Sequence, residues 1–265
     1  MHQTMNVALP GASARIVVSA RSEVGQVRLV NEDSFIAQSP LFLVADGMGG
    51  HARGDRASQA VVAELGERIS ADFLPTAADI LNAIRTANDA VISLAQQDDG
   101  AMSGTTLAGV ALVATSDGTA AQWMAFNVGD SRIYSWDGRV LEQLSVDHSA
   151  VQELVDAGLL SDEDARVHPN RNVITRAIGA RSDVDADVWL LPVAGAQSFL
   201  ICSDGLTKEL DDDKIAELLG RHDDENTIAD VLVDAANAAG GRDNITVVAV
   251  QSTLIDDKEP ANPTI

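Results

Sequence analysis

The architecture depends most on one segment of the sequence, Leu41-Phe42-Leu43-Val44-Ala45-Asp46-Gly47. Its unbroken apolar run predicts a central strand that is buried on both faces. The run ends in a carboxylate, which costs desolvation free energy at such a place unless it is paired or binds a cation. A second apolar run, Phe199-Leu200-Ile201-Cys202, ends in the same way, in Ser203-Asp204-Gly205. The two runs therefore predict a sheet core with charged groups at the ends of its strands.

The order of the remaining segments indicates antiparallel sheets. Turn signals at Asp117-Gly118 and Asp137-Gly138 lie between strand-like runs, as hairpins prefer. Two consecutive amphipathic helices, at about 56–70 and 77–96, separate an early group of strands from a late group, which argues against a βαβ winding. We therefore predict an α+β fold, a four-layer α-β-β-α sandwich in which helices cover two packed antiparallel sheets.

One domain accounts for most of the chain. We expect it to span residues 16–253, preceded by an N-terminal extension over 1–15 and followed by a flexible C-terminal tail over 254–265. The end of the chain is polar and contains Pro260 and Pro263, which favours fraying.

The composition excludes several classes of partner. Lys and Arg number 18 against 40 Asp and Glu, a formal charge of -22 that disfavours nucleic acids and anionic membranes. The acidity either serves only solubility or includes carboxylates that converge on cations. The single cysteine, Cys202, allows no intramolecular disulfide and no cysteine-based zinc cluster. With neither a signal peptide nor an apolar run long enough to span a membrane, we expect a cytoplasmic protein.

Four carboxylates flank the apolar strands. Asp33 precedes one strand, Asp46 and Asp204 follow the two quoted runs, and Asp243 precedes the run at 245–250. Strands placed side by side could bring these groups to one edge of the sandwich. Oxygen ligands select Mg²⁺ or Mn²⁺ rather than Zn²⁺. The alternative for any Asp-Gly pair is an ordinary turn, and we retain it for the pairs at 99–100, 117–118 and 137–138.

Seven motifs in the chain resemble those of a known family, in the family's order. They are Val27-Arg28-Leu29-Val30-Asn31-Glu32-Asp33-Ser34, Val44-Ala45-Asp46-Gly47-Met48-Gly49-Gly50-His51, Ser103-Gly104-Thr105-Thr106, Asn127-Val128-Gly129-Asp130-Ser131-Arg132, Asp147-His148-Ser149, Cys202-Ser203-Asp204-Gly205-Leu206 and Gly241-Arg242-Asp243-Asn244-Ile245-Thr246. In these motifs the chain resembles the metal-dependent Ser/Thr protein phosphatases of the protein phosphatase 2C (PPM) type, in their compact bacterial form.

The resemblance implies that residues 16–253 are a phosphatase catalytic domain with a binuclear Mn²⁺ or Mg²⁺ site. By motif position, Asp46 would bridge both ions and the Gly47 carbonyl would bind one of them. Asp204 and Asp243 would bind the other. A water that bridges the ions would then attack the phosphorus of phosphoserine or phosphothreonine.

Further residues acquire roles from the same resemblance. Asp33, with Glu32, would act through metal-bound water, and Asp130 matches the position of a third, weaker ion in bacterial members. Arg28 is the candidate phosphate clamp, because a guanidinium holds two phosphate oxygens at once. His51 is the candidate acid for the leaving oxygen, although bacterial members place it later in the motif than eukaryotic members place theirs.

The expected partners follow from this activity. They are phosphorylated protein substrates and a Ser/Thr kinase as the functional counterpart, and we expect a monomer. Residues 147–181 are a candidate flap that affects substrate choice; the alternative is an ordinary helical connection.

Other chemistries fit the sequence less well. A cysteine phosphatase needs an arginine where Lys208 follows Cys202, and the motifs of zinc/iron phosphoesterases and of P-loop NTPases do not occur. The main rival is a non-catalytic phosphoprotein-binding regulatory module on the same fold.

Overall fold

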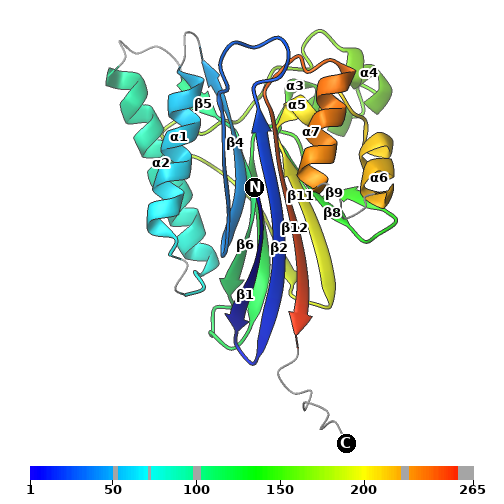
Figure 1. Ribbon diagram of the computed structural model, residues 1–265. Coiled ribbons are helices and arrows are strands. Elements are labelled where there is room, and N and C mark those ends of the chain that lie inside the picture. The colour runs from blue at the N-terminus through cyan, green and yellow to red at the C-terminus, as the bar shows by residue number, and fades with distance from the viewer. Residues whose placement is uncertain (50–52, 71–72, 98–102, 222–226, 256–265) are drawn as a thin grey trace, which may run out of the picture.

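The computed structural model describes residues 1–49, 53–70, 73–97, 103–221 and 227–255. Two antiparallel sheets pack face to face, and helices cover the outer face of each (Figure 1). The predicted four-layer α-β-β-α sandwich is therefore confirmed.

The first sheet has the strand order β1-β2-β12-β11-β8-β9. Its strands are β1 (His2–Leu9), β2 (Ala12–Glu23), β8 (Arg132–Trp136), β9 (Leu141–Gln143), β11 (Ala196–Cys202) and β12 (Ile245–Ile255). The long strand β12 pairs with β2 on one side and with β11 on the other. The run ending in Cys202 thus lies inside the sheet, as its continuous apolar pattern predicts.

The second sheet has the order β10-β7-β6-β4-β3, and β5 pairs with the end of β4. Its strands are β3 (Asp33–Gln38), β4 (Leu41–Gly49), β5 (Ser103–Thr105), β6 (Leu107–Ala114), β7 (Ala121–Val128) and β10 (Asp187–Pro192). The quoted run forms β4, which lies between β3 and β6, and Leu41 through Ala45 are all buried.

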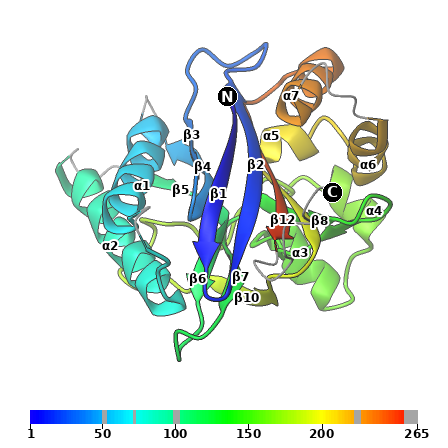
Figure 2. The same cartoon turned by 60° about the horizontal axis from the view of Figure 1, so that its bottom comes forward.

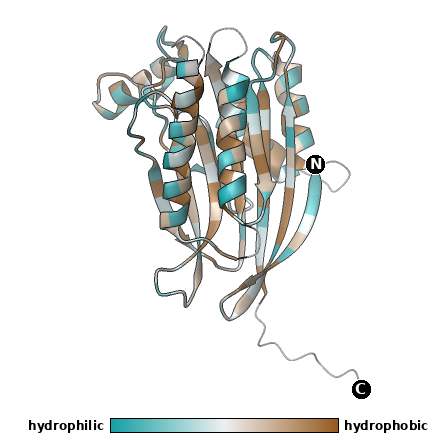
Figure 3. Cartoon of the chain, turned by 90° about the vertical axis from the view of Figure 1, so that its left-hand side faces the viewer, coloured by the Kyte–Doolittle hydropathy of each residue, from teal (hydrophilic) through white to brown (hydrophobic). Residues whose placement is uncertain are grey.

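Helices on the two outer faces complete the layers (Figures 1 and 2). On the second sheet lie α1 (Gly54–Arg68) and α2 (Ala77–Gln97). On the first sheet lie α5 (Asp204–Thr207), α6 (Asp212–Arg221) and α7 (Ile228–Ala239). The candidate flap contains α3 (Ala150–Asp156) and α4 (Asp162–Val167). Figure 3 shows that α1 and α2 carry hydrophilic residues on the side turned to the viewer.

Three apolar clusters hold the layers together. One lies between α1, α2 and the second sheet, another lies between the two sheets, and the third lies between α5–α7 and the first sheet. In the middle cluster, the ring of Trp123 lies 6.2 Å from that of Phe42 and 5.1 Å from that of Phe199, centroid to centroid. Phe199 belongs to the opposite sheet, so Trp123 joins the two sheets through the core.

The sheet extends further at both ends than the sequence pattern predicts. Residues 2–15, expected as an extension, form β1 and the start of β2, so the sandwich begins at His2 rather than at Ile16. Met5, Val7 and Leu9 alternate with more exposed residues and pack against the middle cluster. Such a half-buried edge strand gives only a weak signal in the sequence. At the other end β12 continues to Ile255, and residues 256–265 of the expected tail lie outside the described residues.

The helices α4, α5 and α6 were not predicted. α4 and α5 have six and four residues, too few to show a clear apolar period, whereas the ten residues of α6 do show one. Within the described residues, no helix is both long enough and apolar enough to cross a bilayer.

We expect Trp123→Ala to destabilise the protein by about 3–5 kcal/mol, because it removes the largest side chain of the inter-sheet core. Trp123→Phe should cost clearly less. The indole nitrogen is buried and has no hydrogen-bond partner within the described ranges, so its loss leaves nothing unpaired. Urea denaturation of both variants tests this. Equal destabilisation by the two would contradict the view that the volume of the ring carries the contribution of Trp123.

Candidate metal centre

Two carboxylates face each other where β3 and β4 meet. Asp33 is the register partner of Asp46 on the neighbouring antiparallel strand. Directly opposed residues project to the same face of a sheet, with Cβ atoms about 4.5–5.5 Å apart, and like charges in that arrangement repel. The apolar residues that follow Asp33 and precede Asp46 fix this pairing, because a slip by one residue would turn the buried faces outward.

Asp33 also connects the two sheets. Its Oδ2 accepts hydrogen bonds from the Ser203 hydroxyl, at 2.8 Å, and from the Thr246 hydroxyl, at 2.7 Å. Ser203 and Thr246 lie at the ends of β11 and β12 in the opposite sheet, where the Ser203 amide donates to the Thr246 carbonyl. The other oxygen, Asp33 Oδ1, is buried and has no hydrogen-bond partner in the described part of the chain.

Asp204 and Asp243 share one lysine. Lys208 Nζ lies 2.5 Å from Asp204 Oδ2 and 3.0 Å from Asp243 Oδ2. Asp243 also accepts from Arg28, whose Nη2 lies 2.9 Å from Asp243 Oδ1. Asp204 Oδ1, like Asp33 Oδ1, is buried without a partner among the described residues.

A glycine lets these two acidic segments approach. Gly205 follows Asp204 directly, and a Cβ atom added to it would fall on the carbonyl of Asn244, the residue after Asp243. Only a residue without a side chain allows this contact. The Asp-Gly sequence at 204–205 therefore serves the close approach of two chain segments.

Burial and repulsion between carboxylates raise the pKa values of Asp33, Asp46 and Asp130. Burial raises the pKa of Asp33 to about 7 against the hydrogen bonds from Thr246 and Ser203, and the charges of Asp204 and Asp243 raise it further. Burial, followed by repulsion from Asp33, Asp204 and Asp130, raises the pKa of Asp46 well above its usual value. Burial likewise raises the pKa of Asp130 to about 7, with help from Asp204.

Such a cluster suits hard cations. A buried carboxylate group needs positive charge to remain ionised, and the free oxygens of Asp33 and Asp204 are unused acceptors. No three acidic, histidine or cysteine side chains of the described residues converge closely enough to enclose one ion. Mg²⁺ sites, however, often take only one or two carboxylates and complete their shell with water and substrate oxygens. The donor set therefore fits Mg²⁺ or Mn²⁺ in partly hydrated sites.

Gly47 and Glu32 lie on the α1 side of the cluster. A Cβ atom on Gly47 would fall on the backbone of Gly54, the first residue of α1. Glu32 accepts the Gly54 amide on its Oε1 at 3.1 Å, and its carbonyl accepts the Gly47 amide at the same distance. Glu32 therefore holds the start of α1 against the end of β4.

Asn244 positions the loop that carries Arg28. Its side-chain nitrogen donates to the carbonyls of Val24, at 3.0 Å, and Val30, at 2.9 Å, and its Oδ1 accepts the Glu32 amide at 2.8 Å. The loop crosses the end of the sandwich at which β4 finishes (Figure 1). Arg28 is thereby held over Asp243 with its side chain about half exposed, at 49%.

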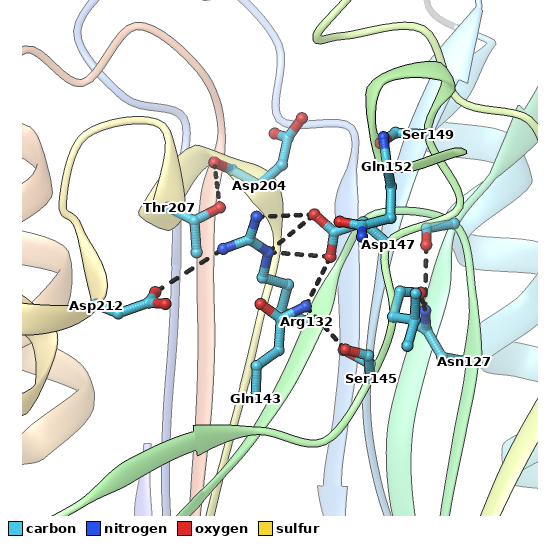
Figure 4. A network of polar contacts seen from close by, with 12 residues as sticks. Asn127, Arg132, Gln143, Ser145, Asp147, Ser149, Gln152, Asp204, Thr207 and Asp212 are labelled. Carbon is cyan, nitrogen blue, oxygen red and sulfur yellow. Dashed lines mark hydrogen bonds and ion pairs between the residues drawn. The ribbon is translucent and has the colours of Figure 1, made fainter. Parts of the chain in front are cut away.

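A second polar network borders Asp204 (Figure 4). Arg132 binds both carboxylate oxygens of Asp147, through Nε at 3.0 Å and Nη2 at 2.7 Å. The next residue, His148, accepts the Gly129 amide on Nδ1 at 3.0 Å, which leaves Nε2 to donate to Asp187 at 3.2 Å. These contacts fix the backbone on both sides of Asp130 and tie it to the start of the candidate flap.

The structure thus brings Asp33, Asp46, Asp130, Asp204 and Asp243 into one electrostatically coupled cluster, with Arg28 at its rim. Gly47 lies at the end of β4 beside the cluster, while the Glu32 carboxylate turns to the α1 backbone. His51 lies outside the described residues.

Sequence reasoning missed four side chains that hold the cluster. They are Lys208, Ser203, Thr246 and Asn244. The spacing of Lys208 from Asp204, one helical turn, was a readable signal for an ion pair. The hydroxyl contacts of Ser203 and Thr246 join opposite sheets, and no spacing along the chain reveals them.

Comparisons with known proteins point to one family. The family profile described as protein phosphatase 2C matches residues 25–235. A serine/threonine phosphatase, stp, of Listeria monocytogenes is 37% identical over 245 residues, 88% of this chain and 95% of its own length. The crystal structure of the Mycobacterium tuberculosis serine/threonine phosphatase PstP/Ppp is 35% identical, with a TM-score of 0.78 over 89% of this chain and 97% of that one.

A further structure was solved with metal. The catalytic domain of the serine/threonine protein phosphatase PstP, in complex with two manganese ions, superposes with a TM-score of 0.78 at 33% identity, over 92% of this chain and 100% of that one.

We expect Gly205→Ala to lower the melting temperature strongly, because its methyl group would overlap the Asn244 carbonyl. Gly66→Ala is the matched control. Gly66 lies inside α1 with room for a methyl group, 3.7 Å from Ile36 Cδ1, so this change should raise stability by about 0.5–1 kcal/mol. Thermal unfolding in EDTA compares the two. A Gly205→Ala protein as stable as wild type would contradict the close approach.

The raised pKa values predict how stability depends on pH. Asp33 and Asp130 titrate near 7 in the fold but near 3.8 when unfolded, so between these values the folded state binds more protons. The stability of the metal-free protein should therefore fall as pH rises from 5 to 8. Cation binding needs ionised carboxylates, so the stabilisation by Mn²⁺ should grow over the same range.

Melting temperatures in EDTA and in Mn²⁺ at pH 5, 6.5 and 8 check both trends. Asp130→Asn in EDTA should flatten the decline. A metal-free melting temperature that rises steadily through this range would contradict the raised pKa values.

Proposed function

Because the chain belongs to the protein phosphatase 2C family and is a metal-dependent serine/threonine phosphatase of that type, we propose that its acidic cluster hydrolyses phosphoserine and phosphothreonine on proteins with two Mn²⁺ or Mg²⁺ ions. The observation that supports this best is the meeting of buried carboxylates from both sheets, two of whose oxygens lack a partner among the described residues. Such oxygens, in a site that disfavours their charge, are suited to a cation.

In this proposal Asp46 and the Gly47 carbonyl would hold one ion. Asp204 and Asp243 would hold the other, and Asp130 would hold a third, weaker one. When bound, the ions supply a water of lowered pKa and neutralise the charge of the phosphate group. The remaining tasks fall to the chain itself.

Asp33 is suited to control the attacking water. Ser203 and Thr246 fix its Oδ2, so Oδ1 has a defined direction and remains free to accept a hydrogen bond. Its pKa of about 7, raised by burial, lets it take a proton near neutral pH. Glu32 contributes by holding the segment between Asp33 and α1 rather than by direct contact. His51 remains the proposed acid for the leaving oxygen.

Arg28 is suited to bind the phosphate group. Asp243 and the loop anchored by Asn244 hold its guanidinium at the rim, half exposed. A guanidinium has five donors, so the contact through Nη2 leaves capacity for two phosphate oxygens. The clamp therefore lies beside a carboxylate that we assign to an ion, where the phosphate must also lie.

The biological setting follows from the reaction. An enzyme that removes phosphate from serine and threonine on proteins counteracts a Ser/Thr kinase, and we propose such a kinase as the functional counterpart. The two flap helices, α3 and α4, lie at the same end of the molecule as α5 (Figure 1), where they can contact the protein part of a substrate.

We expect hydrolysis of a phosphothreonine peptide and of para-nitrophenyl phosphate in Mn²⁺, and none in EDTA. Asp204→Asn should lower kcat for both substrates by at least about 100-fold. The change weakens the binding of an ion that would stabilise the negative charge of the transition state. Asp213→Asn, an exposed change at the start of α6, is the control and should leave kcat unchanged. Absence of turnover in folded, Mn²⁺-loaded wild type would support the non-catalytic regulatory module instead.

We expect Arg28→Ala to raise KM for the phosphopeptide about tenfold or more while Mn²⁺ binding persists, because a charge-assisted bidentate contact is lost. Arg28→Lys should recover only part of the lost affinity for the phosphopeptide, since an ammonium group cannot hold two phosphate oxygens in that geometry. Arg85→Ala, on the exposed face of α2, is the matched control. An unchanged KM for Arg28→Ala would refute the clamp.

A further inference from the structure

Lys208 occupies the centre of one half of the proposed metal site. Its Nζ lies 2.5 Å from Asp204 Oδ2 and 3.0 Å from Asp243 Oδ2. Both carboxylates are mostly buried, with 16% and 17% of their side chains exposed. The ammonium group thus partly offsets the charge of the two residues that we assign to a single ion.

A lysine in this position must compete with that ion. Mg²⁺ binds oxygen at about 2.0–2.1 Å and needs the lone pairs that Lys208 now uses. Two positive charges about 4 Å apart also repel, the more strongly where water is scarce. The ion and the ammonium group therefore cannot both occupy the space between Asp204 and Asp243.

The side chain is able to leave. Lys208 is the C-terminal cap of α5, one turn after Asp204, and 31% of its side chain is exposed. Its four-carbon stem is flexible, and an ammonium group is strongly hydrated in water. Rotation of the stem would return the charge to solvent without moving the backbone of α5.

We propose that Lys208 is an internal counterion that stabilises the metal-free site and is displaced when the ion at Asp204 and Asp243 binds. This inference rests on the proposed two-ion site. Lys208 sets the affinity of that ion: its ion pairs must break before the metal binds, so the apparent dissociation constant is higher than the carboxylates alone would give.

The two states of the site respond oppositely to the loss of this charge. Without metal, removal of the ammonium group leaves the buried Asp204 carboxylate without its cation and Asp243 with Arg28 alone, which lowers stability. With metal, the competitor is gone and the ion binds more tightly, which raises the stabilisation that it provides. A lysine with a purely structural role would lower stability in both states and leave the affinity unchanged.

The test measures Mn²⁺ binding by calorimetry and melting temperature in EDTA or saturating Mn²⁺, without reference to activity. Lys208→Met keeps the stem and removes the charge, and Lys208→Arg keeps the charge. Lys214→Met, an exposed lysine on α6 paired with Glu217, is the matched control.

We expect Lys208→Met to melt lower than wild type in EDTA, to bind one Mn²⁺ about tenfold more tightly, and to gain more from Mn²⁺ in melting temperature. Lys208→Arg and Lys214→Met should bind as wild type does. Equal or weaker Mn²⁺ binding by Lys208→Met, with normal binding by wild type, would overturn the counterion. Failure of wild type to bind Mn²⁺ at all would instead overturn the proposed function on which it rests.

Discussion

Asp33 and Asp46 face each other across the β3–β4 pairing, and the charges of Asp130, Asp204 and Asp243 lie close enough to act on them. Their repulsion in a buried place is the constraint on which the rest of the site depends. Electrostatic repulsion alone would favour separation of these carboxylates, yet the hydrophobic runs that end in them must lie inside the sheets. The free energy of burying β4 and β11 thus holds carboxylates together that would otherwise move apart.

Three features of the chain make that arrangement tolerable. The hydroxyl groups of Ser203 and Thr246 stabilise one oxygen of Asp33 across the gap between the sheets. Gly205 allows the segments of Asp204 and Asp243 to approach. Lys208 and Arg28 supply positive charge at the edge. Because burial still raises the pKa values of Asp33, Asp46 and Asp130, these cations only partly offset the repulsion, and the site favours further positive charge.

Much of the fold could be predicted from the sequence. Continuous apolar runs identified β4 and β11 as buried strands, and long helical periods identified α1 and α2, because each pattern reflects burial of a whole element. The edge strand β1 and the short helices α4 and α5 were missed, because their few buried residues leave little pattern.

The acidic residues of the site could be predicted from the sequence because each lies next to a buried apolar strand. Their partners were not, since Ser203, Thr246 and Asn244 act through contacts that only the packing of two sheets creates. Glu32 shows the same limit: its motif suggested a place among the metal-site residues, and no pattern in the sequence revealed that its side chain also accepts the Gly54 amide at the start of α1. The spacing of Lys208 from Asp204 was enough to predict an ion pair between them. Its importance, however, depends on Asp243, which is far away in sequence.

The most direct test of a cation-binding site at this junction is X-ray diffraction from crystals grown in Mn²⁺, with data collected at the manganese absorption edge. We predict one anomalous peak beside Asp46 and the Gly47 carbonyl and a second beside Asp204 and Asp243, with Lys208 Nζ displaced from both carboxylates. A map at saturating Mn²⁺ without peaks at these carboxylates, and with Lys208 still between Asp204 and Asp243, would contradict it.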